Sequence, residues 1–64
     1  MDLKNFVGKT VIIIANRTSY QGVLESDSND VVTLIGEYDG EEFLIIIPKI
    51  GIDSILIPMG RRHE

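Results

Sequence analysis

The sequence predicts an all-β protein, a strongly bent antiparallel sheet of five strands closed as a small barrel and preceded by at most one short helical turn. Three observations lead to this fold class. Short runs rich in Ile and Val alternate with clusters of turn-forming residues. Beyond the first few residues, no segment has the apolar spacing of a helix. The length of 64 residues suits one small domain, placed at residues 1–60, with 61–64 as a tail.

At most one short helical turn is expected near the start of the chain. In "DLKNF" the apolar residues Leu3 and Phe6 are spaced so that they share one side of a turn. "KTVIIIAN" follows and predicts the first strand at residues 9–16, because β-branched side chains suit a pleated, half-buried surface. "NRTS" predicts the turn that ends this strand.

The second strand is predicted at residues 19–26, in "YQGVLES", where Tyr20, Gly22 and Leu24 share one face by the period of two. Gly22 inside a strand indicates a bend or a bulge, as a small barrel needs at its corners. "DSND" then predicts a tight polar turn at residues 27–30, because Asp, Ser and Asn cap and bend the backbone.

The second half of the chain predicts three more strands. "VVTLIGE" predicts one near residues 30–36 and "EFLIII" another at 41–47, and the Asp-Gly pair at 39–40 is the strongest hairpin signal in the chain. Pro48 cannot donate a strand hydrogen bond, so "PKIG" is expected to break the fourth strand. "IDSILI" predicts a short fifth strand at 53–57.

The last two predicted strands carry apolar side chains on both faces. In "FLIII", Leu44 and Ile46 point opposite to the other three residues, so only one set can fill the barrel. Either the sharp bend lets some residues serve both interior and rim, or another copy of the chain covers the second set. We expect oligomerisation. The predicted interface residues are Leu44, Ile46, Ile55, Leu56 and Ile57.

Composition narrows the ways in which so small a domain can be stabilised. Domains below about 70–80 residues often rely on disulfides, a metal or oligomerisation. The chain has no cysteine and a single histidine, His63, so neither a disulfide nor a thiolate or histidine-rich metal site is expected. Ten acidic and six basic residues give a net charge of −4. This charge argues against a broad nucleic-acid surface, although it allows a local basic ring.

Neither catalysis nor a cofactor is expected. The acidic residues lie mostly in predicted turns, and no nucleophile pairs with a base in the sequence pattern. No apolar run approaches the roughly 20 residues of a membrane-spanning helix, and "MDLKNFVGK" lacks the apolar core of a signal peptide. Together with the absence of cysteine, this favours a cytoplasmic protein.

Three segments carry a family resemblance: "VGKTVII", "YQGVLESDSNDVVTL" and "IIIPKIGIDSILI". Their order resembles the entry into strand one, the Sm1 block and the short Sm2 block of the Sm-like (LSm/Hfq) superfamily of small β-barrels. The resemblance spans residues 3–57. It implies a five-stranded barrel in which strand four of one subunit pairs with strand five of the next, closing a ring of six or seven copies.

Sm-like proteins bind RNA near the pore through loop residues of both blocks. The resemblance points to Asn29 and Lys49 as RNA contacts, whereas Ser28, Asp30 and Val32 stand where the family has Asp, an aromatic residue and Asn. From the residues themselves, the favoured interpretation of Asn29 is a turn residue with left-handed backbone, and that of Lys49 is an edge residue that discourages stray strand pairing.

Two functions therefore stay open. One is a ring that binds single-stranded RNA near its pore, and the other is an oligomeric protein-interaction or scaffold module without nucleic-acid binding. The tail leaves a similar choice. Arg61, Arg62 and His63 contact phosphate or an acidic partner, or they extend into solvent.

Overall fold

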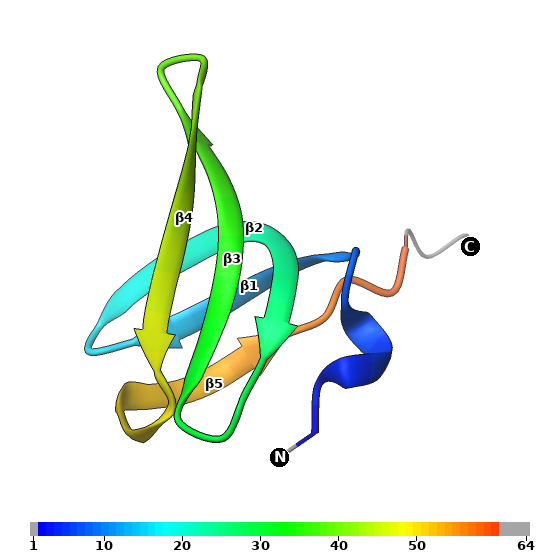
Figure 1. Ribbon diagram of the computed structural model, residues 1–64, viewed down its shortest axis with the longest axis vertical. Coiled ribbons are helices and arrows are strands. Elements are labelled where there is room, and N and C mark those ends of the chain that lie inside the picture. The colour runs from blue at the N-terminus through cyan, green and yellow to red at the C-terminus, as the bar shows by residue number, and fades with distance from the viewer. Residues whose placement is uncertain (1, 61–64) are drawn as a thin grey trace.

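A single bent sheet of five antiparallel strands dominates the computed structural model, which describes residues 2–60 (Figure 1). The tail at 61–64 lies outside the described residues. The predicted all-β class and all five predicted strands are confirmed, each within two residues of its expected bounds. The strands are β1 (Thr10–Ala15), β2 (Thr18–Asp27), β3 (Val31–Tyr38), β4 (Glu41–Pro48) and β5 (Ile52–Leu56).

The sheet is open, so the predicted closure into a barrel is not confirmed. Its strand order is β4-β3-β2-β1-β5, which makes β4 and β5 the two edges. Each edge strand is paired on one side only, β4 with β3 and β5 with β1. Among the described residues no further strand bridges these two edges.

Two tight hairpins link the strands where the turn chemistry predicts them. Asn16 and Arg17 have φ of 51° and 67°, and Asp39 and Gly40 have φ of 54° and 77°. Two successive residues with positive φ form the type I′ turn, whose twist matches that of the flanking strands. The β3–β4 hairpin projects beyond the rest of the sheet at the top of Figure 1.

The core lies inside the bend of the sheet. Along β1 every second side chain is buried, which is the period expected of a strand with one buried face. Residues of β1 to β4 and of the start of the chain together form the buried apolar core. It comprises Leu3, Val11, Ile13, Ala15, Leu24, Val32, Leu34 and Ile47.

Two helical turns flank the sheet. The expected N-terminal turn is η1 (Lys4–Phe6), with Leu3 buried and Phe6 packed against the core. A second turn, η2 (Lys49–Gly51), links β4 to β5. It was not predicted, because Pro48 and Gly51 indicate only a break in the strand. Both are three-residue 3-10 turns, and no helix within residues 2–60 is long and apolar enough to cross a membrane.

Gly22 and a nearby bulge shape the bend. A Cβ atom at Gly22 would lie 2.5 Å from the Ile35 carbonyl oxygen, so only glycine allows β2 to approach β3 this closely. The predicted bulge lies further along β2, where the register shifts between Leu24 and Ser26. Glu25 is the extra residue, and its carboxylate accepts a hydrogen bond of 2.8 Å from the Thr33 hydroxyl.

Candidate functional site

The loops that carry the predicted RNA contacts meet at one end of the sheet. The Lys49 N–H donates to the Asp30 carbonyl at 2.8 Å, which joins the β4–β5 connection to the β2–β3 turn. In that turn the Ser28 N–H and hydroxyl both donate to the Val31 carbonyl, each at 3.0 Å. Asn29 is exposed, and it lacks the left-handed backbone expected of a turn residue.

The buried carboxylate of Asp27 forms an ion pair with Lys49, the predicted basic contact to RNA. The Lys49 Nζ lies 2.6 Å from Asp27 Oδ1, with side-chain exposures of 23% and 3% respectively. The Leu3 N–H donates to Asp27 Oδ2 at 2.8 Å. Asp27 therefore ties the end of β2 to both helical turns. Sequence reasoning missed this role and placed Asp27 only in the polar turn.

The surroundings of Asp27 keep it charged. The hydrogen bond from the Lys49 ammonium and then that from the Leu3 N–H hold the pKa of Asp27 below its ordinary value of 3.8, against the opposing effect of burial. At neutral pH the carboxylate thus neutralises Lys49. A phosphate approaching Lys49 has to compete with a partner that is already in place.

Protonation of Asp27 is expected to cost stability. Because its pKa is lowered on folding, its contribution is full above about pH 3.8 and is lost as the pH falls through the folded value. We expect Asp27→Asn to lower the free energy of unfolding by about 1–3 kcal/mol at pH 7. Urea unfolding between pH 7 and pH 2 should show this difference shrinking at the acid end. Asp30→Asn, an equal change in the exposed turn, is the control, and an equal loss in both variants would contradict the role of Asp27.

The outer edge of β4 has unpaired backbone groups beside apolar side chains. Hydrogen-bonded residues alternate along an antiparallel strand with residues whose N–H and C=O face away. The bond from Lys49 to Asp30 fixes this alternation, so Ile45 and Ile47 bond to β3. Leu44 and Ile46 then direct their N–H and C=O to the free edge.

The same alternation identifies the backbone groups of β5 that face its free outer edge. The Leu24 N–H donates to the Lys9 carbonyl at 2.9 Å. The odd-numbered residues of β1 therefore hydrogen-bond to β2, and the backbone groups of Ile12 and Ile14 face β5. Their partners on β5 are Leu56 and Ser54. Ile55, between these two, therefore directs its N–H and C=O to the free edge.

The five predicted interface residues fall into two groups. Leu44, Ile46 and Leu56 are exposed by 56%, 59% and 47%. Ile55 and Ile57 are partly buried and pack against the core. The exposed side chains therefore lie on the two edge strands, which are the elements whose backbone also lacks partners.

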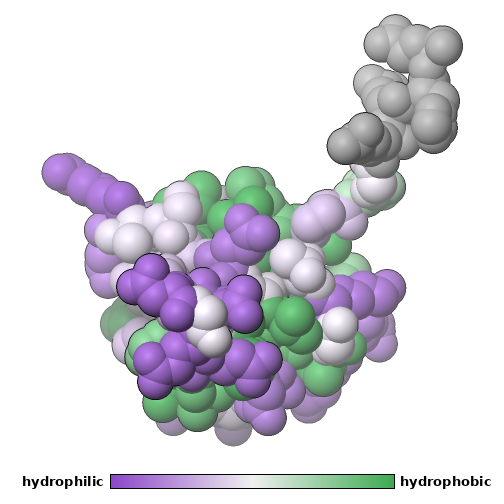
Figure 2. All heavy atoms as spheres, turned by 90° about the horizontal axis from the view of Figure 1, so that it is seen from above, coloured by the Kyte–Doolittle hydropathy of each residue, from purple (hydrophilic) through white to green (hydrophobic). Residues whose placement is uncertain are grey.

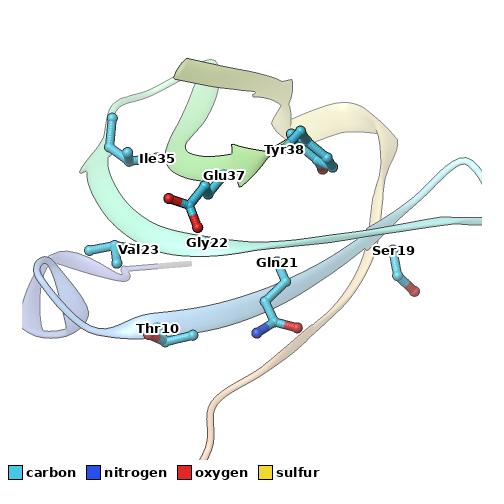
Figure 3. Close-up of a pocket in the computed structure, with 9 residues that line it drawn as sticks. Thr10, Ser19, Gln21, Gly22, Val23, Ile35, Glu37 and Tyr38 are labelled. Atoms are coloured by element: carbon cyan, nitrogen blue, oxygen red, sulfur yellow. The ribbon is translucent and has the colours of Figure 1, made fainter. Parts of the chain in front are cut away.

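An open groove was not predicted by the sequence. It has a volume of about 550 Å³ and forms where β2 and β3 diverge beyond Gly22. Glu37 reaches from β3 toward β2 at its rim (Figure 3). The sequence feature that could have indicated this groove is the pair of glycines at the bend, Gly22 and Gly36, which both line it. Within residues 2–60, no three His, Asp or Glu side chains converge as they would around a metal ion.

In comparison with known proteins, no family model, no curated protein and no solved structure matches this chain.

Proposed function

We propose that this chain is the subunit of an Sm-like homo-oligomer, a ring-forming module held together by pairing of β4 with β5 of the next copy. One observation carries the proposal. The two strands with unpaired edges are also the strands with exposed Leu and Ile side chains. Free apolar edges promote aggregation unless something covers them. A second copy offers the matching edge.

The two edges favour a head-to-tail assembly. β4 and β5 are different surfaces at opposite ends of the sheet, so their contact is heterologous. Such contacts generate a ring when the rotation closes and a filament when it does not. The strong bend of the sheet favours closure. The strand β5 of the next copy would also extend the sheet that one chain leaves open. By the family resemblance we expect six or seven copies.

Single-stranded RNA is the ligand that we propose for this ring. It is favoured by the hydrogen bond between Lys49 and Asp30, which holds the loop of Asn29 beside Lys49. In a ring these loops would repeat around a pore, where even one cation per subunit produces a local positive field. Against RNA stand the net charge of −4 and the pairing of Lys49 with Asp27. A protein-interaction scaffold is the function that remains without RNA.

The native mass in solution, with and without a short oligo-U or oligo-A RNA, tests both functions. We expect a discrete oligomer in each case. If RNA binds, binding should be weak and should fall steeply with salt. Lys49→Gln should then weaken it, and Arg17→Gln, which removes a cation from the β1–β2 turn, should not. A mass of 7.1 kDa at all concentrations would contradict assembly. An oligomer without RNA binding at low salt would leave the scaffold function.

A further inference from the structure

The hairpin end of β4 combines an apolar groove with an uncompensated negative charge. The groove has a volume of about 440 Å³ and is lined in part by β4, one of the two edge strands. Its lining is almost entirely apolar and aromatic, with the Tyr38 and Phe43 rings packed edge to face at a centroid distance of 5.8 Å. It is formed by Tyr20, Tyr38, Phe43, Leu44 and Ile45.

Four exposed carboxylates surround the hairpin turn: Glu37, Asp39, Glu41 and Glu42. Glu37 stands directly opposite Glu42 in the β3–β4 register, and like charges at this position destabilise a hairpin. Within residues 2–60 the one ion pair is between Lys49 and Asp27, at a distant loop, so no described cation pairs with them. Figure 2, viewed with this hairpin toward the reader, shows hydrophilic residues at its centre and hydrophobic surface on either side. These four carboxylates would therefore attract a positively charged partner.

The assembly proposed above directs a basic segment to this place. In antiparallel pairing, β5 of the next copy runs along β4 toward the hairpin turn. The alternation of free groups allows two registers that oppose Ile46 to an isoleucine, either Ile55 or Ile57. Continued in the same direction, the first register brings Arg61 opposite Gly40, and the second brings it opposite Glu42. In both registers Arg61 and Arg62 would lie beside the hairpin turn that carries the four carboxylates.

The residues between β5 and the arginines fit this path. Pro58 lacks an N–H, but by the alternation its nitrogen faces β1, so no bond to the neighbour is lost. Met59 is 95% exposed in the single chain, and in the second register it would stand opposite Leu44, which lines the apolar groove. Gly60 has φ of 87° in the single chain, and as a glycine it can also adopt the extended backbone that both registers require before the arginines.

We propose that the C-terminal segment of a neighbouring copy, residues 58–62, docks along the hairpin end of β4. Met59 covers the apolar groove, and Arg61 and Arg62 pair with the carboxylates of the hairpin turn. Docking rests on the edge-to-edge assembly and adds to it an electrostatic contact at each interface. The assembly should accordingly weaken as salt is raised.

Charge reversal with rescue tests this docking. Arg61→Glu with Arg62→Glu should raise the dissociation constant of the oligomer about tenfold in low salt, because several opposite charges become like charges. Glu41→Arg with Glu42→Arg should have the same effect. All four changes together should return the constant to within about threefold of the wild type, since the charges are again complementary. Sedimentation velocity at about 50 mM and 500 mM salt measures these constants, and the differences should shrink at the higher salt.

The matched control is Lys9→Glu with Arg17→Glu. Like the reversal of the two C-terminal arginines, it lowers the formal net charge by four, from −4 to −8, but it lies away from the hairpin. Equal weakening by the control and by the arginine reversal would overturn the docking while leaving edge pairing intact. The docking would also be overturned if the variant with all four changes kept a raised dissociation constant. A wild type that stays monomeric would overturn the assembly itself and the docking with it.

Discussion

Ile46→Lys is expected to separate the oligomer into single subunits. In edge-to-edge pairing this side chain enters a dry contact with the neighbouring copy, where an unpaired ammonium costs several kcal/mol. A loss of about 3 kcal/mol per interface corresponds to a dissociation constant more than 100-fold higher. Leu56→Lys, on the opposite edge, should act in the same way. Sedimentation velocity over a range of concentrations should show smaller species for both variants.

Val23→Lys controls for the introduction of a charge on the surface. Val23 is exposed by 39%, but it belongs to β2, which is paired on both sides and cannot form an edge. We expect this variant to keep the mass of the wild type. Should Ile46→Lys and Leu56→Lys also keep the wild-type mass and stability, these side chains face solvent and the interface lies elsewhere.

Gly22→Ala is expected to lower the free energy of unfolding by about 2–3 kcal/mol, in the upper range for an overpacked site. The added Cβ would meet the Ile35 carbonyl oxygen at 2.5 Å, and this oxygen belongs to the backbone of β3. The strands would have to separate at the bend. A domain of this length has a total stability of about 3–10 kcal/mol, so the loss is a large share of it. Urea unfolding at a fixed protein concentration measures the change.

Gly51→Ala is the matched control for this substitution. Its Cβ would lie 3.1 Å from the side-chain amide of Asn16, which can move aside at small cost. We expect a change below about 1 kcal/mol, as for substitutions away from packed backbone. If Gly22→Ala proved as mild as Gly51→Ala, the close approach of β2 and β3 would not depend on glycine.

Local chemistry explains why the strands and hairpins were predictable. The β-branched runs and the Asp-Gly turn act over a few residues, and the structure places them within two residues of expectation. The alternation in "FLIII" likewise separates Ile47, which is buried, from Leu44 and Ile46, which are exposed. Each of these signals is contained in a short segment.

Contacts between distant residues were not predictable in this way. Asp27 and Lys49 are far apart in sequence, and no local pattern distinguishes this aspartate from its neighbours in "DSND". The open sheet was missed for a similar reason, because closure depends on whether β4 and β5 meet in three dimensions. The bulge at Glu25 lies three residues beyond the glycine that indicated it.

Amide hydrogen exchange at the strand edges tests the central claim most directly. Within one subunit the N–H groups of Leu44, Ile46 and Ile55 have no strand partner, whereas that of Ile47 bonds to β3. Pairing of β4 with β5 of the next copy predicts that all four exchange slowly at concentrations where the oligomer forms. It also predicts that the three edge amides become fast on dilution. Fast exchange of the edge amides in a sample of oligomeric mass would contradict edge pairing.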